Sequence, residues 1–305
     1  IRERAVELIE IVEDPRRVFE AGMRAASCIE QHRIAVSAAK DAGFVATSNV
    51  EVARELELIA GGTTGHEHTQ RFFGDRAAFC AVRDRVAGEV TFLLDTYSTQ
   101  HSGLPVAISV MKQTPKRQCS IRFDSEDTME EDYRLGVSSF REAGIEAGIN
   151  LGGGFNAVKT RRFEALRAEV SWPRPLQRYM YGQYLVEPHV PLPTRGDVGA
   201  VYKLSESAGR ATMKFSDTPA KSSAPGRPVT WRLVEEGGTS GRPLGVIGQD
   251  GEQPAEGYVV LADGSAPVIE AEQLRGKKPV WSEASAALVT QLTELRENQI
   301  HEVSN

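Results

Sequence analysis

The chain has 305 residues, 40% hydrophobic and 26% charged, with a formal net charge of −6 and a pI near 5.7. That length exceeds the usual range of one hydrophobic core, and the acidic balance excludes a long nucleic-acid interface but still allows a local phosphate pocket. The three cysteines are widely spaced without a C-x-x-C pair, and no apolar run reaches the roughly 18 residues that span a bilayer, so we expect a cytoplasmic protein that binds neither membranes nor nucleic acid.

The N-terminal segment of the chain shows helical periodicity. Apolar positions recur at helical spacing through residues 1–40, first Val6 and Ile9 and then Val18 and Ala25. This spacing predicts two helices.

The next segment is expected to form a helix, a strand and another helix. Ser48 followed three residues later by Glu51 gives a capping-box pattern, which predicts a helix start. We expect Gly61 and Gly62 to end that helix, the strand LIAGGT to come next, and a long helix to cover residues 67–86.

Strands and helices then alternate regularly. We expect strands at 91–97, 120–125, 149–156 and 177–186, and helices at 104–112, along the stripe of Met129, Tyr133, Val137 and Phe140, and after Asn156. This alternation predicts parallel pairing of the strands and an α/β fold.

Beyond residue 188 the sequence becomes rich in Pro, Gly and Ser. Two alternating runs separated by Ser207-Ala208-Gly209 predict a hairpin. The remaining expectations are a loop at 235–257, a short strand at 257–262, and a final helix at 282–300 that packs through Ala284, Leu288, Leu292 and Leu295.

Five residues that suit chemistry or phosphate binding each follow an apolar stretch at intervals of 29 positions: His66, Asp95, Asp124, Gly153 and Gly182. That interval is about the length of one strand, one helix and two loops. Because residues that follow successive parallel strands meet at one edge of a sheet or barrel, the spacing predicts a single site built from several strand ends.

The segment GTTGHEH at 62–68 places two imidazoles directly after a strand. A neutral His66 imidazole could accept a phosphoryl group or a proton near neutral pH, whereas in the simpler alternative it only hydrogen-bonds a loop carbonyl. A zinc site made by His66 and His68 is disfavoured because no third ligand lies nearby in the sequence.

Asp95 and Asp124 each follow a run of strand-forming residues. A carboxylate at this position could hold a metal–phosphate complex or a sugar hydroxyl, or it could simply cap the following helix. Alternation along the strand puts Arg122 on the same side as Asp124, so the two could bind phosphate and ribose together. The triplet Gly152-Gly153-Gly154 before a helix suits an anion site, although glycines also serve ordinary turns.

Six ordered blocks together resemble the nicotinate phosphoribosyltransferase family, over roughly residues 18–235. They are TSNV at 47–50, GTTGHEH at 62–68, LLDTYST at 93–99, IRFDSED at 121–127, GGGFNAVKTRRFEAL at 152–166, and VYKLSE with KFSD at 201–217. The resemblance implies an irregular, incomplete α/β barrel of the type II phosphoribosyltransferase kind at 1–190, a smaller β-rich portion at 191–280 and a C-terminal helix at 281–305.

The family joins nicotinate to 5-phosphoribosyl-1-pyrophosphate with Mg²⁺ and couples this reaction to ATP hydrolysis through a phosphohistidine, usually as a homodimer. The resemblance therefore implies small-molecule substrates, Mg²⁺ and ATP for this chain, without identifying the metal ligands. It matches His66 to the phosphorylated histidine and gives catalytic roles to Arg122 and Asp124. Substrate or phosphate binding is implied for Arg24, Ser48, Asn49, Thr63, Asp95, Ser125, Gly153, Gly154 and Gly182.

The chain also departs from the family pattern. Glu126 stands where the family has glycine, which adds a negative charge beside a site for phosphates, and Met180 replaces a glycine of the second phosphate loop. Ala25 replaces an arginine, Gly152 replaces a serine, and an N-terminal portion of the family has no counterpart. Two alternatives therefore stay open: a catalytically silent homologue that binds phosphorylated ligands, and an enzyme that uses nicotinamide or quinolinate.

Overall fold

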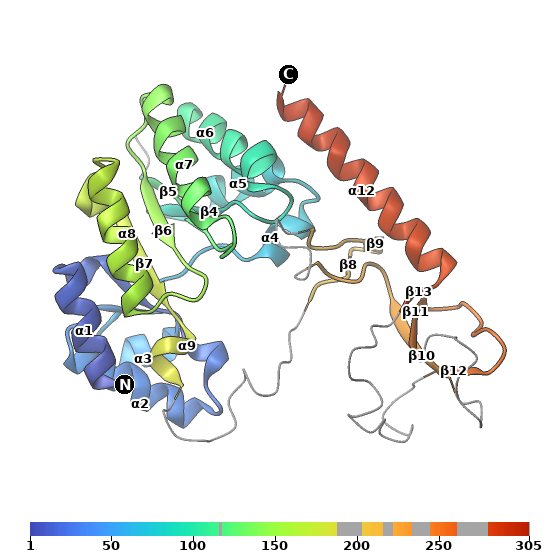
Figure 1. The fold of residues 1–305 in the computed structure, drawn as a ribbon, viewed down its shortest axis with the longest axis horizontal. Coiled ribbons are helices and arrows are strands. Elements are labelled where there is room, and N and C mark those ends of the chain that lie inside the picture. The colour runs from blue at the N-terminus through green and yellow to red at the C-terminus, as the bar shows by residue number, and fades with distance from the viewer. Residues whose placement is uncertain (116–117, 188–202, 216–221, 234–244, 261–279, 305) are drawn as a thin grey trace. The chain divides into compact units, whose positions relative to one another are not determined.

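The computed structural model describes residues 1–115, 118–187, 203–215, 222–233, 245–260 and 280–304, which belong to two compact units (Figure 1). The first unit comprises Ile1–Tyr202 with Ser216–Pro219, and the second comprises Lys203–Phe215 with Ala220–Asn305. The domain boundary predicted at residue 190 and the start of the VYKLSE block lie outside the described residues.

The first unit is built on one seven-stranded sheet in which every pairing is parallel. Its order is β3-β2-β1-β7-β6-β5-β4. The strands are β1 (Val18–Glu20), β2 (Ala46–Thr47), β3 (Ile59–Ala60), β4 (Val90–Leu93), β5 (Cys119–Phe123), β6 (Gly148–Leu151) and β7 (Gln177–Tyr181). The predicted α/β fold is confirmed, but the expectation of a helix through Val18 and Ala25 is wrong, because Val18 begins strand β1.

The sheet curves toward a barrel without closing. Strands β3 and β4 are consecutive along the chain yet form opposite edges of the sheet. The loop after β3 bridges these edges, since the Thr64 hydroxyl donates to the backbone oxygen of Thr91 on β4 at 3.3 Å. This open half-barrel confirms the incomplete barrel expected from the resemblance, and it brings a loop from one edge of the sheet to the other.

Nine α-helices are described in the first unit, besides short 3-10 and π-helical segments. In Figure 1, α5 to α8 run beside strands β4 to β7. Their bounds are α1 (Arg2–Val12), α2 (Ile29–Asp41), α3 (Val50–Glu55), α4 (His66–Arg71), α5 (Asp75–Arg85), α6 (Leu104–Gln113), α7 (Met129–Ala143), α8 (Ala157–Glu169) and α9 (Gln183–Val186). The stripe predicted on α7 is confirmed, because Met129, Tyr133, Val137 and Phe140 are all buried.

Two helix boundaries differ from the sequence expectation. Residues 67–86 form two helices, because Phe73 adopts a left-handed φ of 56° and Gly74 leaves the helical region. Helix α3 is capped by Asn49 rather than by Ser48, since the Asn49 side chain accepts the backbone N–H of Val52 at 3.1 Å. That helix ends before β3, so the glycine pair follows the strand and does not terminate the helix.

The outer face of the sheet supplies the core of the first unit. Phe92, Ile121, Ile149 and Tyr179 come from four neighbouring strands and are fully buried. Arg17 is also buried within this core, where it donates to the backbone oxygens of Val12 and Gln177 and forms an ion pair with Glu164.

The second unit contains a hairpin, a small sheet and the C-terminal helix. Its elements are β8 (Glu206–Ser207), β9 (Arg210–Ala211), β10 (Pro228–Leu233), β11 (Gly245–Gln249), β12 (Tyr258–Val260), β13 (Val280–Trp281) and α12 (Glu283–Ser304), with the small sheet ordered β12-β10-β11-β13. The hairpin turn at Ala208-Gly209 and the strand near residue 258 are confirmed, while β11 lies in the segment expected to be a loop.

Helix α12 packs on the small sheet partly by the expected face, since Leu288 and Leu292 are half-buried. Ser285 is fully buried and its hydroxyl lies 3.1 Å from the side-chain nitrogen of Gln249 on β11, whereas Ala284 and Leu295 are exposed. The short hydroxyl side chain at 285 allows close approach to the sheet, a contact that an apolar stripe does not predict.

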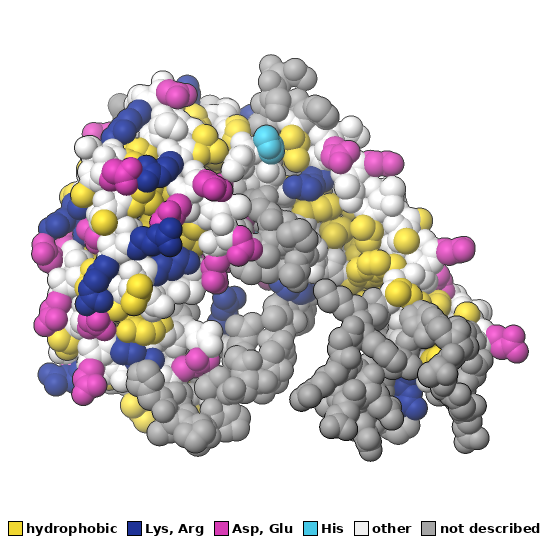
Figure 2. Space-filling model, viewed as in Figure 1, with side chains coloured by type: hydrophobic (Ala, Val, Ile, Leu, Met, Phe, Trp, Pro, Cys, Tyr) yellow, Lys and Arg dark blue, Asp and Glu magenta, His cyan; other side chains and the backbone are white. Residues whose placement is uncertain are grey.

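Charge of both signs covers the face drawn in Figure 2, where Lys and Arg side chains lie interspersed with Asp and Glu over the first unit. Among the described residues, no helix combines the length and apolar character needed to cross a bilayer.

Candidate functional site

The predicted site lies at the carboxyl edge of the parallel sheet. Asp95, Asp124, Gly153 and Gly182 follow β4, β5, β6 and β7, and these four strands are direct neighbours in the sheet. Because the strands are parallel, all four residues leave the sheet at the same edge. The interval of 29 residues therefore corresponds to one strand–helix unit of this sheet.

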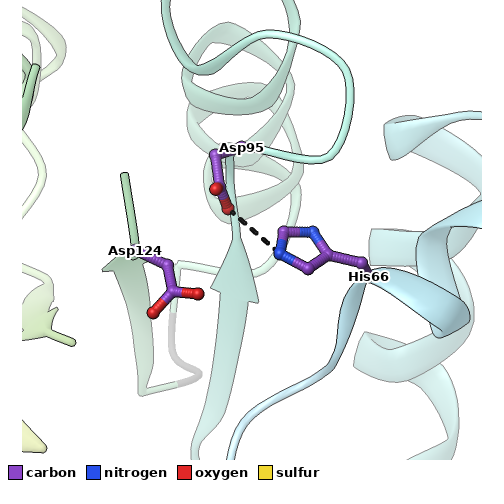
Figure 3. Close-up of side chains that lie close together, drawn as sticks. All are labelled: His66, Asp95 and Asp124. Carbon is purple, nitrogen blue, oxygen red and sulfur yellow. Dashed lines mark ion pairs between the residues drawn. The ribbon is translucent and has the colours of Figure 1, made fainter. Parts of the chain in front are cut away.

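His66 reaches this edge from the loop that follows β3. It is the first residue of α4, and its Nε2 lies 3.8 Å from Oδ1 of Asp95 (Figure 3). One ligand atom from each of His66, Asp95 and Asp124 lies within 4.8 Å of the other two. The half-barrel thus gathers an imidazole and two carboxylates that are far apart in the sequence.

Hydroxyl groups orient two members of this trio. Nδ1 of His66 lies 3.1 Å from the hydroxyl of Thr96, which leaves Nε2 facing Asp95. The buried hydroxyl of Ser125 donates to Oδ2 of Asp95 at 3.0 Å. Because both contacts come from residues directly after strand ends, the sheet itself fixes how the imidazole and the carboxylate face each other.

Arg122 and Asp124 point to the same side of β5 and form an ion pair at 2.6 Å, as the alternation predicted. Arg122 also donates through Nη1 to the hydroxyl of Thr63 at 2.8 Å, which ties the loop before His66 to the sheet. Gly152 leaves room for this pair, since a Cβ there would lie 3.1 Å from both Nε of Arg122 and Oδ1 of Asp124. The cation and the acid predicted to act together are therefore adjacent.

The glycine turn after β6 touches the same group. Gly153 and Gly154 adopt left-handed φ angles of 78° and 66°, and a Cβ on Gly153 would lie 2.8 Å from the backbone oxygen of Asp124. Lys159 in the first turn of α8 donates to the Gly153 oxygen at 2.7 Å. The turn precedes helix α8, whose N-terminus favours an anion although Asn156 already accepts the N–H of Lys159 at 2.9 Å, so a phosphate next to Asp124 is compatible with this turn.

The other predicted binding residues gather near the ends of β1 and β2. Arg24 is exposed after β1, and it forms no hydrogen bond or ion pair with any residue that the structure describes. Ser48 donates its backbone N–H to the oxygen of Glu20 at 2.9 Å. A Cβ on Gly182 would meet only Ala21, in the loop after β1, within 4 Å. The structure does not place these residues against the trio, and their binding roles stay predictions.

A buried polar network near these residues was not foreseen. Asn49 accepts the N–H of Val52 through Oδ1, so its amide nitrogen faces Nδ1 of His32 at 3.1 Å. The His32 proton therefore resides on Nε2, which donates to Glu20 at 3.0 Å. Glu20 also accepts the hydroxyl of Thr47. This network fixes the loops that carry Arg24 and Ser48, and it was missed because β1 was expected to be helical.

His68 makes a structural contact between two helices. Its Nε2 lies 3.0 Å from the backbone oxygen of Ala78, so its ring is used to join α4 to α5. The partners of His66 come instead from two other strand ends, which a zinc motif read along the sequence cannot reveal.

The trio also suits a divalent cation. Mg²⁺ prefers carboxylate oxygens together with substrate phosphates, and Asp95 and Asp124 offer such oxygens within 4.8 Å of each other. His66 adds a nitrogen donor, which suits Mg²⁺ less well. The donor set therefore fits Mg²⁺ through the two acids.

Comparisons with known proteins agree with the motifs. No family model matches the chain. The chain is 28% identical over 228 residues to a nicotinate phosphoribosyltransferase of Bacillus subtilis, covering 72% of this chain and 44% of that protein, and 27% identical over 224 residues to one of Bos taurus, covering 68% and 38%. The chain thus spans less than half the length of these curated relatives.

Solved structures show the same fold. The crystal structure of nicotinate phosphoribosyltransferase from Porphyromonas gingivalis matches with a TM-score of 0.55 at 22% identity, over 73% of this chain and 60% of that one. The family resemblance predicted from the motifs and the half-barrel fold are both confirmed.

Proposed function

We propose that the chain acts as a nicotinate phosphoribosyltransferase-like pentosyltransferase. It would join nicotinate to 5-phosphoribosyl-1-pyrophosphate, releasing nicotinate mononucleotide and pyrophosphate, in the salvage of pyridine nucleotides. The relatives named for this activity support the proposal. The observation that carries it is the convergence of His66, Asp95 and Asp124 at one sheet edge, beside a glycine turn suited to phosphate.

Asp124 would act on the sugar. When the bond from C1 of the ribose to pyrophosphate breaks, positive charge develops on the ring, and a nearby carboxylate stabilises that charge. Arg122 fixes this carboxylate through their 2.6 Å ion pair and places a positive charge where phosphate oxygens would lie. Gly153 and Gly154 would hold the 5′-phosphate through their backbone.

His66 would couple the reaction to ATP. Nδ1 faces Thr96, so the lone pair of Nε2 is the one directed into the site. In this step Nε2 attacks the γ-phosphorus, the bond from that phosphorus to the departing ADP oxygen breaks, and a phosphohistidine forms. The Nδ1–H group, donating to the Thr96 hydroxyl, would hold the imidazole in line for attack, and Asp95 would serve the phosphates through the cation instead, because an unprotonated Nε2 cannot donate to its carboxylate. Mg²⁺, when bound by Asp95 and Asp124, supplies charge neutralisation for the phosphates.

The remaining parts of the proposal follow from the resemblance. The carboxylate of nicotinate needs a cationic partner, and the exposed Arg24 is the candidate. A homodimer in the cytoplasm would complete the assembly.

The test of ATP coupling uses γ-labelled ATP. The wild-type chain should acquire a label that is labile to acid and stable to base, and His66→Ala should remove it. His101→Ala is the matched control, because His101 is exposed, lies in the short helical segment Thr99–Gly103 and is not a member of the trio. A label that persists in His66→Ala would overturn the assignment of the phosphorylated residue.

One observation favours a second candidate, a catalytically silent homologue that binds phosphorylated ligands. The carboxylate of Glu126 lies against the glycine turn where a phosphate would bind. Absence of any label on the wild-type protein, together with retained binding of ribose 5-phosphate, would favour this alternative.

A further inference from the structure

The side chain of Glu126 lies across the glycine turn that follows β6. A Cβ on Gly154 would lie 3.0 Å from Cδ and from both carboxylate oxygens of Glu126, and a Cβ on Gly153 would lie 3.3 Å from its Cγ. The carboxylate can approach this closely because neither residue of the turn carries a side chain. A negative group of this chain therefore already sits on the face of the turn.

That face is suited to negative charge. Gly153 and Gly154 have consecutive left-handed φ angles, and α8, of 13 residues, begins three positions later. Lys159 places its ammonium group 2.7 Å from the Gly153 oxygen. The dipole of α8 and the charge of Lys159 favour an anion near this turn, whether it is a phosphate or a carboxylate.

Among the described residues, none holds the Glu126 carboxylate in this position by a hydrogen bond or an ion pair. Its side chain is exposed, and it forms no hydrogen bond or ion pair with any other residue in the described parts of the chain. It is also not a member of the trio that could hold a cation, which comprises His66, Asp95 and Asp124. The carboxylate thus lies beside the turn without a hydrogen bond to it, so a rotation about its own side-chain torsions would move it away.

We propose that Glu126 is an internal competitor of the phosphate group that binds the Gly153–Gly154 turn, and that it sets the affinity of the site for phosphorylated sugars. The identity of the sugar phosphate as part of the donor rests on the proposed function. A phosphate ligand displaces the carboxylate from the turn, and the two negative groups then repel each other at short range. Glu126 consequently weakens binding of the phosphate without taking part in any chemical step.

The test measures binding of ribose 5-phosphate by calorimetry to the wild-type protein, Glu126→Gln and Glu126→Gly. Glu126→Gln removes the charge and keeps the bulk, and should bind about tenfold more tightly, which corresponds to about 1.4 kcal/mol. Glu126→Gly also removes the bulk and should bind at least as tightly. Glu131→Gln is the matched control, an exposed acid on α7 whose loss should leave affinity unchanged.

Equal affinity of the wild-type protein and Glu126→Gln, or no binding by Glu126→Gln, would overturn the proposal. A repeat with Mg²⁺ separates competition from cation bridging, because weaker binding by Glu126→Gln in its presence would show that the carboxylate helps to hold the ligand. Ribose 5-phosphate carries neither a leaving group nor a pyridine. A protein without pentosyl transfer activity can therefore still show the predicted tightening. The test thus distinguishes failure of the proposal for Glu126 from failure of the proposed enzymatic activity.

Discussion

At the scale of single residues, the orientation of Asp95 depends on one buried hydroxyl. Ser125 is 3% exposed and donates to Oδ2 of Asp95, while the other oxygen of that carboxylate faces His66. Ser125 is therefore a positioning residue in the proposed mechanism. It acts there through Asp95, and the substrate contact implied by the resemblance stays a prediction.

Ser125→Ala should slow labelling of His66 by ATP about tenfold, while urea unfolding still shows a folded protein. The reason is that a hydrogen bond to a charged group contributes about 1.5–3 kcal/mol, and its loss leaves the Asp95 carboxylate without this alignment. Ser138→Ala, which removes an exposed hydroxyl on α7, is the control. A labelling rate equal to that of the wild type would show that Asp95 needs no help from Ser125.

The residues of the trio could be predicted from the sequence, but their supporting partners could not. The regular spacing of His66, Asp95 and Asp124 follows from the repeating strand–helix unit, which is visible as alternating apolar segments. Thr96 and His32 carry no such signal, because their roles depend on rotamers and on which nitrogen of an imidazole faces a neighbour. Such contacts are decided by packing and not by periodicity.

At the scale of elements, a buried ion pair joins α8 to the sheet. Arg17, which precedes β1 and is 1% exposed, pairs with Glu164 on α8, and Tyr179 on β7 donates to the same carboxylate at 2.6 Å. Burial alone would raise the pKa of Glu164, but the hydrogen bonds from Arg17 and Tyr179 and the charge of Arg17 outweigh it and lower that pKa below its ordinary value of 4.5. Burial raises the pKa of Tyr179, so its hydroxyl stays protonated and remains the donor.

Glu164→Gln should lower the free energy of unfolding by about 3 kcal/mol at pH 7, because it leaves Arg17 buried without a charged partner. A lowered pKa in the folded state means that the carboxylate stabilises the protein fully above about pH 4.5 and loses this effect as the pH falls through the folded-state pKa. The difference between variant and wild type in urea unfolding should therefore shrink at pH 3.

Glu169→Gln on the same helix is the control for this experiment. Glu169 pairs with Arg134 on the surface, with both side chains largely exposed, so its removal should change stability little. A difference between Glu164→Gln and the wild type that stays constant from pH 7 to pH 3 would contradict the role given to the Glu164 charge.

The sequence predicted the long elements better than the short ones. The stripe on α7 spans about three turns and is unambiguous, whereas β1 has three residues and its apolar positions also satisfy a helical spacing. The break at Phe73 was hidden because a non-glycine residue adopts the left-handed conformation there. Short strands inside a parallel sheet are fixed by their neighbours, which local sequence does not report.

At the scale of the whole molecule, the position of the site follows from the strand order. Because β3 and β4 lie at opposite edges, only a curved sheet allows the loop after β3 to contact β4. The alternation of strands and helices predicted a parallel sheet. Its curvature into an incomplete barrel was expected only from the family resemblance. The matched region covers 44% of the Bacillus subtilis protein, so the chain corresponds to part of that relative.

The most direct test measures formation of nicotinate mononucleotide from nicotinate and 5-phosphoribosyl-1-pyrophosphate, with Mg²⁺ and ATP, by the wild-type protein and Asp124→Asn. Asp84→Asn serves as control, because Asp84 is an exposed acid on α5. We expect product from the wild type and from the control, and a loss of at least a hundredfold in Asp124→Asn, since its amide cannot stabilise the charge that develops on the ribose. Product formation by Asp124→Asn at the wild-type rate would contradict the account. Absence of product with all three proteins would contradict it as well.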